Sequence, residues 1–119
     1  MDTAAKKNVL RLFTYGLFAV TVNDNGNGHG MLANWITQIS FEPPMLALAV
    51  EHDSHMRRLI DMYGAFAVNV LESGQRELAG QLGKTFAKHP DKFNDVVWKP
   101  GPATGSPWCM ADRRAGGWA

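Results

Sequence analysis

The chain has 119 residues, 45 % of them apolar, and twelve Lys and Arg residues face eleven Asp and Glu residues, giving a net charge of +1. This length and composition predict one globular domain and exclude a largely disordered chain. The balanced charge argues against nucleic-acid binding, and the one cysteine, Cys109, excludes both an intrachain disulfide and a zinc site of several thiolates. No leader is visible and no apolar run approaches the ~20 residues of a membrane span, so we expect a cytoplasmic protein without a membrane partner.

The first predicted elements are a helix and a β-hairpin. A helix is expected over residues 3–13, with Thr3 as its cap, and the β-branched and aromatic run at 17–22 predicts a strand. The segment NDNGNGHG at 23–30 consists of turn formers, which predicts a hairpin connection with positive-φ positions. Its glycines lie between two strands and do not open a helix, so a dinucleotide-binding loop fits them poorly.

Two further strands are predicted in the middle of the chain. The first covers residues 31–40 and ends at Pro43 and Pro44, which cannot donate hydrogen bonds to a β-ladder. The second is the continuously apolar run MLALAV at 45–50. An unbroken apolar run of this length is typical of a strand buried on both faces, and we expect that here.

The rest of the chain alternates helix and strand and then loses its pattern. Ser54 is predicted to cap a helix that Gly64 ends, residues 65–71 to form a strand, and residues 73–83 to form a third helix. Short strands with closely spaced turns and two inserted helices predict a mainly β protein, a small barrel with peripheral helices. Residues 101–119 have no period, which predicts an irregular tail behind a domain over residues 1–100.

The segment His52-Asp53-Ser54-His55 allows several interpretations. Two histidines three residues apart can share a metal, but no third ligand follows at a persuasive spacing. A hydrolase triad is disfavoured because its members come from distant parts of a chain and no G-x-S-x-G segment exists. A solvated helix start is the interpretation that we favour, and we expect no metal site.

Polar residues interrupt the strand predicted over 31–40, namely Asn34, Thr37, Gln38 and Ser40. Buried amides and hydroxyls need hydrogen-bond partners, which either the backbone or a polar ligand such as a ribityl chain could provide. The helix start at Ser54 could hold a phosphate with its free N–H groups, and Arg57 could add charge. A satisfied strand face and a solvated helix surface are the structural alternatives, and the sequence leaves both open.

The order of these segments resembles the flavin reductase-like family of FMN-binding split barrels. The strand GLFAVTV, the run GMLANWITQIS, the SFEPP corner, the polar HDSH helix start and the strand GAFAVNVL follow one another in the family order. The resemblance covers about residues 8 to 95. It implies an FMN-binding split β-barrel with peripheral helices, and usually a homodimer in which each flavin contacts both chains.

The resemblance also implies a set of cofactor-binding positions. They include one segment against the flavin ring and ribityl chain, polar and basic positions toward the phosphate, and a basic–aromatic pair, with Trp35, Phe41 and Phe93 as candidates for stacking. The predicted positions are Met31, Leu32, Ala33, Asn34, Trp35, Ser40, Ser54, Arg57, Lys92 and Phe93. No catalytic side chain is assigned, because the flavin itself carries the redox chemistry.

The implied activity is hydride transfer from NAD(P)H to flavin. FMN is the expected flavin, with FAD as the alternative, and an acceptor protein such as a monooxygenase is the expected user of the reduced flavin. After about Pro100 the chain departs from the family pattern, and residues 101–119 look like the product of a truncated or frameshifted gene. Two other functions therefore stay open: a flavin-binding electron-transfer module without its own nicotinamide site, and an inactive truncated relative.

Overall fold

A computed structural model describes residues 2–109, which form three helices and seven strands. The strands make three antiparallel sheets, in the orders β2-β1-β5, β3-β4 and β6-β7, and within residues 2–109 they do not close into a barrel. No helix in this part of the chain is long and apolar enough to cross a membrane. The elements are α1 (Thr3–Leu10), β1 (Phe18–Asp24), β2 (Asn27–Ala33), β3 (Ile36–Ser40), β4 (Met45–Leu48), α2 (His55–Tyr63), β5 (Ala67–Val70), α3 (Arg76–Leu82), β6 (Trp98–Pro100) and β7 (Pro107–Cys109).

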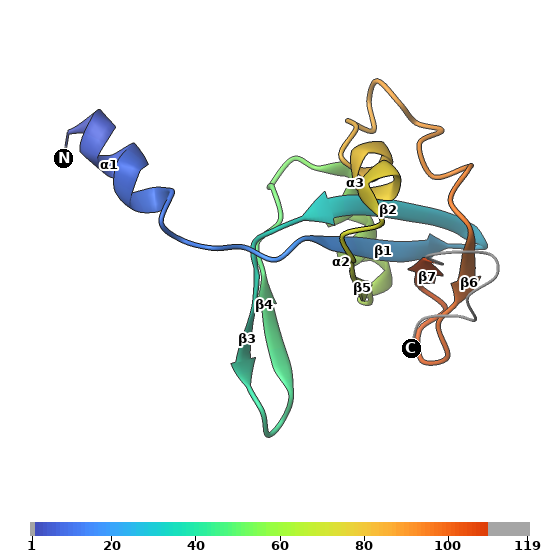
Figure 1. The fold of residues 1–119 in the computed structure, drawn as a ribbon. Coiled ribbons are helices and arrows are strands. Elements are labelled where there is room, and N and C mark those ends of the chain that lie inside the picture. The colour runs from blue at the N-terminus through green and yellow to red at the C-terminus, as the bar shows by residue number, and fades with distance from the viewer. Residues whose placement is uncertain (1, 110–119) are drawn as a thin grey trace.

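Strand β1 is the centre of the core, because it pairs with both β2 and β5. Its side chains alternate between the two faces of the sheet. Val20 and Val22 pack on the face covered by Met56 and Leu59 of α2. Ala19 points to the other face, where Leu82 of α3 lies together with Phe93 and Cys109. The two helices therefore cover opposite faces of one small sheet (Figure 1).

The β1–β2 turn is tighter than the predicted connection over 23–30. Only Asn25 and Gly26 have positive φ, of 50° and 95°, and β2 already begins at Asn27. Gly28 and Gly30 lie inside β2, where their role is close approach. A Cβ on Gly28 would lie 2.5 Å from Phe93 Cε1, and one on Gly30 would lie 2.7 Å from Phe93 Cε2. The glycines thus form a flat strand surface on which the Phe93 ring lies.

The strand predicted over 31–40 is in fact two strands, because the chain leaves β2 after Ala33 and enters β3 at Ile36. The prediction that residues 45–50 are buried on both faces is wrong. Met45 and Leu46 of β4 are about half exposed, at 48 % and 51 %. Hairpin β3–β4 projects from the central sheet (Figure 1). Ile36 and Leu48 at its base pack against the core, whereas most residues toward its tip are exposed.

The predicted ends and caps agree with the structure for α2 but not for α1, and α3 begins later than predicted. Helix α1 ends at Leu10 and is capped by Asp2, whose Oδ1 accepts from Ala4 N at 3.4 Å, so neither the end at residue 13 nor the cap at Thr3 is correct. Ser54 caps α2 as predicted, and Gly64 ends that helix in the left-handed region. Helix α3 begins at Arg76, because the Gln75 side chain accepts from Glu72 N and holds residues 72–75 in a turn.

The segment expected to be an irregular tail contributes one strand, β7, to an ordered hairpin. Strands β6 and β7 pair with each other, and β7 is held against the central sheet by Thr21, whose hydroxyl donates to Pro107 O at 2.6 Å. Asn69 of β5 donates to Pro107 O and accepts from Cys109 N, which joins β5 to β7. Strand β7 is therefore joined to the central sheet by hydrogen bonds. Residues 110–119 lie outside the described residues, and the domain boundary at residue 100 stays a prediction.

Candidate functional site

A groove of about 420 Å³ lies where β2, α2 and α3 approach one another. Its first wall is the end of β2 with the break before β3, its second is the stretch between β4 and α2, and its third is the end of α3 with the loop that follows. The wall residues are Met31, Leu32, Ala33, Asn34, Trp35, Ala49, Val50, Glu51, Ser54, Leu82, Gly83, Lys84 and Lys92. This volume falls in the usual range of small-molecule sites.

Seven of the ten predicted flavin positions line this groove: Met31, Leu32, Ala33, Asn34, Trp35, Ser54 and Lys92. The first five follow one another because β2 ends at Ala33 and the chain runs along the groove before β3 begins. Ala49 N donates to Trp35 O at 3.0 Å, which joins the first wall to the second. Asn34 is exposed and its amide makes none of the hydrogen bonds found among residues 2–109, so it is free to meet a ligand.

Ser54 contributes both a hydroxyl and a helix start. Its Oγ accepts from Arg57 N at 3.1 Å, the ordinary capping hydrogen bond of a helix. The hydroxyl hydrogen is not used in that bond, so Ser54 can cap α2 and donate to an anion at the same time. Helix α2 has nine residues, and the free N–H groups and positive dipole end at its start favour a phosphate.

Lys92 is buried and mainly organises the third wall. Its Nζ donates to Leu82 O and to Lys84 O, each at 2.9 Å. These bonds neutralise the negative end of α3 and fix the loop after it. Burial lowers the pKa of the Lys92 ammonium, because the charged form loses hydration. An ammonium has three donors, so one remains beyond these two bonds.

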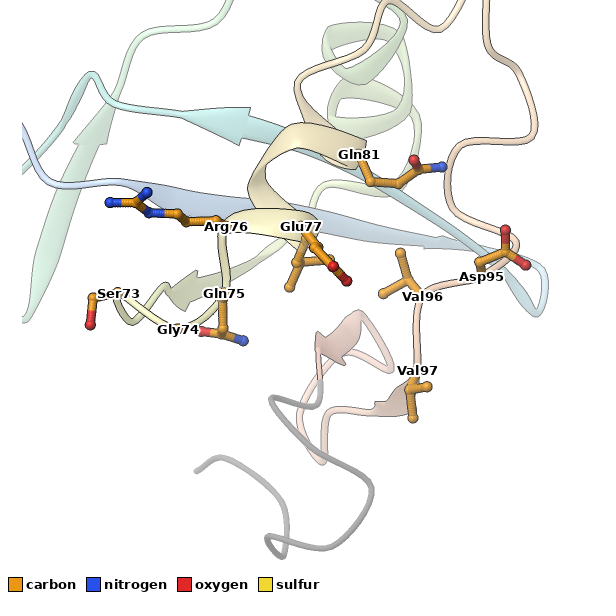
Figure 2. A pocket seen from close by; sticks show the side chains of 10 residues that line it. Ser73, Gly74, Gln75, Arg76, Glu77, Gln81, Asp95, Val96 and Val97 are labelled. Carbon is orange, nitrogen blue, oxygen red and sulfur yellow. The ribbon is translucent and has the colours of Figure 1, made fainter.

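A second hollow, of about 660 Å³, lies between the start of α3 and residues 95–97 (Figure 2). Its charged side chains are of both signs, with Arg76 beside Glu77 and Asp95 across from them. None of the predicted flavin positions lines it. The second hollow is larger, but the groove at Trp35 is the better candidate site, because the groove combines an apolar wall with amide, hydroxyl and ammonium donors.

The comparison with known families decides what kind of protein this is. A family model described as flavin reductase-like domain matches residues 10–115. The chain belongs to this family. The match continues beyond the residues 8 to 95 that carried the resemblance, and it includes hairpin β6–β7. The expectation that the family pattern ends near residue 100 is therefore wrong.

Similar proteins in this family are named for flavin reduction. The chain is 33 % identical to a flavin reductase (NADH) of Kitasatospora aureofaciens over 77 % of its own length and 47 % of that protein. It is 29 % identical to the reductase subunit HsaB of a flavin-dependent monooxygenase of Mycobacterium tuberculosis, over 84 % and 52 % of the two chains. The solved NADH:FAD oxidoreductase SgcE6 of Streptomyces globisporus is 33 % identical, with a TM-score of 0.76 over 89 % of this chain and 63 % of that one. The chain thus spans about half to two-thirds of the length of these relatives.

Three predicted positions lie elsewhere in this flavin reductase-like domain. Ser40 is at the far end of β3, paired with Met45. The Arg57 guanidinium contacts His52 and lies 3.4 Å from Asp61 Oδ2, one turn along α2. Phe93 is 94 % buried behind β2, so its ring packs against the glycine surface and does not line the groove. Their placement reflects contacts across the fold, which residue spacing does not reveal.

The sequence reasoning also missed part of the groove of this family member. Glu51, Gly83 and Lys84 line it but were not predicted. Gly83 was expected to end α3, and the loop after a helix is a more frequent place for binding residues than the helix itself. That signal could have pointed to Gly83 and Lys84. Nothing in the local sequence could have pointed to Glu51, because only the folding of hairpin β3–β4 brings it to the groove.

Proposed function

We propose that the chain is an NAD(P)H-dependent flavin reductase that binds FMN, with FAD as the alternative, in the groove at Trp35. The single observation that carries the proposal is this groove, in which seven positions implied by the family resemblance meet. The printed names of the relatives, a flavin reductase (NADH) and an NADH:FAD oxidoreductase, support the reaction class. Because the chain spans only part of these relatives, the activity is our proposal.

The wall chemistry fits a flavin. Met31, Leu32 and Leu82 offer an apolar surface for a tricyclic ring, and the Trp35 ring adds an aromatic face. The Asn34 amide can donate and accept, as the mixed edge of the ring or the ribityl hydroxyls require. The phosphate would lie at the start of α2, where Ser54 keeps a free O–H donor.

In this mechanism the protein binds and orients the flavin. The bound flavin supplies the hydride-accepting chemistry, and no side-chain acid or base is needed for it. Asn34 and Ser54 fix the two ends of the ligand, and the apolar wall removes water from one ring face. Lys92 keeps the third wall in place through its bonds to Leu82 O and Lys84 O.

A homodimer with the split-barrel architecture is part of the proposal. The β3–β4 hairpin and the segment just after α1 carry large exposed apolar side chains, including Phe41 at 85 %, Ile39 at 57 % and Leu12 at 79 %. A second copy would cover these side chains and the open sheet edges, and it would add strands next to the groove. We also propose that the reduced flavin serves an acceptor protein such as a monooxygenase, as the name of the HsaB relative suggests. The cytoplasmic location stays a prediction.

The absorption spectrum of the purified protein tests the activity. A flavin spectrum that bleaches on addition of NADH or NADPH under anaerobic conditions supports the reductase. A flavin spectrum that does not bleach contradicts the reductase and supports an electron-transfer module. A protein that neither holds flavin nor reduces added flavin contradicts both and favours an inactive relative.

The Asn34→Leu variant tests the site itself. Asn34 is exposed, so we expect little change in thermal stability. Loss of a hydrogen bond to a bound ligand costs ~1–3 kcal/mol, which corresponds to about ten-fold to hundred-fold weaker flavin binding. Titration of FMN by fluorescence quenching measures this change. Asn94→Leu, at an exposed position away from the groove, is the matched control, and unchanged affinity in folded Asn34→Leu removes Asn34 from the site.

A further inference from the structure

A row of polar side chains joins α2 to the β1–β2 hairpin beside the groove. The Tyr63 hydroxyl donates to Asp24 Oδ1, and Asp24 Oδ2 lies 3.7 Å from His29 Nε2. The other ring nitrogen of His29, Nδ1, lies 3.2 Å from His55 Nε2. The His55 ring stacks on Phe86 with 3.6 Å between the ring centroids and 3° between the planes. The row therefore links three segments that are distant in the sequence.

Each of these segments continues into one wall of the groove, although no residue of the row lines the groove itself. His29 precedes Met31 by two residues in β2, and His55 directly follows Ser54. Phe86 belongs to the loop after α3, which forms the third wall. The His29–His55 contact, with Phe86 stacked on the His55 ring, thus joins the three segments that carry the walls.

The contact holds only a limited number of protons. Asp24 favours a proton on His29 Nε2, so His29 Nδ1 is the acceptor and His55 Nε2 is the donor. One additional proton can sit on His55 Nδ1 without breaking this bond. A second must sit on His29 Nδ1, which places two N–H groups against each other across 3.2 Å. The doubly protonated pair has lost its hydrogen bond and carries two adjacent positive charges.

The surroundings favour the neutral pair. Burial lowers the pKa of both histidines, and the positive charge of Lys92 lowers it further for each. The charges of His29 and Arg58 add to the lowering for His55, and the Asp24 carboxylate opposes it in both rings. A histidine whose pKa lies below its unfolded value of about 6.5 stabilises the fold fully above that pH. This contribution is lost as the pH falls from 6.5 through the lowered pKa.

We propose that His29 and His55 form a proton-operated latch that holds the three groove walls together when neutral and releases them when both rings are protonated. Release frees the start of α2 and the Phe86 loop from β2, so the groove widens in acid. The latch itself does not depend on flavin. Only its consequence, weaker flavin binding at low pH, rests on the proposed function.

A double variant removes the titration but keeps the contact. In His29→Asn the amide oxygen replaces the Nδ1 acceptor, and in His55→Gln the amide nitrogen replaces the Nε2 donor. His89→Gln is the matched control, because His89 is an exposed histidine in the loop after α3 that takes no part in the row. If the double variant does not fold, each single variant is compared with the wild type and with His89→Gln in the same way.

The first readouts use the flavin-free protein. We expect the thermal midpoint of the wild type and of His89→Gln to fall more steeply between pH 6.5 and 5 than that of the double variant. NMR titration of the imidazole resonances should show two coupled steps below pH 6.5 for His29 and His55. Independent titration of both rings near 6.5, or equal slopes in all three proteins, overturns the latch.

The second readout measures binding of riboflavin, because the phosphate of FMN titrates by itself near pH 6. We expect the Kd for riboflavin to rise about three-fold to ten-fold between pH 7.5 and 5.5 in the wild type, and to stay constant in the double variant. Equal rises in both proteins contradict the coupling to the groove. A protein that binds no flavin at pH 7.5 overturns the proposed function, and the melting and NMR results then still decide the latch.

Discussion

Strand β1 and the β3–β4 hairpin have similarly apolar sequences but very different surroundings. Four consecutive residues of β1, from Ala19 to Val22, are buried between α2 on one face and α3, Phe93 and Cys109 on the other. In the hairpin, no residue of either strand is buried, and Phe41 at its tip is 85 % exposed. Figure 1 shows the hairpin and α1 extending away from the body that β1 centres.

The contrast separates what the described residues stabilise by themselves from what they leave uncovered. The body buries its apolar side chains on both faces of one sheet, and the β6–β7 hairpin closes the side beside β5. The arms, α1 and the β3–β4 hairpin, present apolar side chains over a wide surface. A wide exposed apolar surface usually marks an interaction site. The arms are therefore where the proposed second copy would bind.

Truncation of Phe93 should cause the largest loss of stability. Its ring packs on Gly28 and Gly30 and fills the space between β2 and Trp98, so Phe93→Ala leaves a cavity. We expect a loss of about 3–5 kcal/mol in the free energy of unfolding, measured with urea. Phe41→Ala, measured at a concentration at which the chain is monomeric, should change it by less than ~0.5 kcal/mol. Similar losses from both variants would contradict the division into body and arms.

Asn69→Leu should cause the next largest loss. The Asn69 side chain donates to Ala19 O and Pro107 O and accepts from Cys109 N, so it joins β5, β1 and β7. Its removal leaves the Cys109 N–H without its partner and takes one of two donors from Pro107 O, which Thr21 still contacts. This should cost about 2–3 kcal/mol. Hydrogen exchange of the Cys109 amide should rise with it. Asn94→Leu is the control, and a loss no greater than that of the control would show that β7 is not part of the body.

Replacement of exposed apolar side chains in the β3–β4 hairpin tests whether this arm is a self-association surface. Phe41→Ser with Leu46→Ser should weaken self-association about ten-fold to hundred-fold, because exposed apolar anchors dominate such contacts. The circular dichroism and the unfolding of the dilute monomer should stay nearly unchanged. Sedimentation equilibrium measures the association. A wild-type chain that is monomeric at micromolar concentration and still binds flavin would contradict the proposed dimer.

Local rules predicted those parts of the fold whose causes are local. Ser54 and Gly64 bound α2 as expected, because a hydroxyl cap and a left-handed glycine act within a single turn. The strand over residues 17–22 was also predicted, from its β-branched and aromatic residues, and β1 covers Phe18–Asp24. The burial of residues 45–50 was not, because an apolar run shows that a segment can be buried but not whether a partner covers it.

The groove residues show the same difference between what local sequence predicts and what only the fold brings together. The residues from Met31 to Trp35 are consecutive, so a single motif contained all five residues of the first wall. Phe93 was assigned to the ligand but lies behind β2, because two glycines there admit a ring that any side chain would exclude. Glu51 and Lys84 come to the groove from separate elements. The latch between His29 and His55 depends on a contact across 26 residues, which no local pattern contains.

Ser54→Ala should have the smallest effect on stability and on ligand affinity. It tests whether the start of α2 holds the phosphate of FMN. Loss of the cap on α2 costs ~1 kcal/mol of stability, and Ser73→Ala, at an exposed serine that caps no helix, should cost less. Because the Ser54 hydroxyl can donate to a phosphate while it accepts from Arg57 N, FMN should bind about three-fold to ten-fold more weakly, whereas riboflavin affinity should stay constant. The thermal midpoint is followed in the same samples, so that loss of folded protein is not mistaken for loss of affinity. Equal weakening of both ligands would place the phosphate away from the start of α2, because only FMN carries the anion that this helix end attracts.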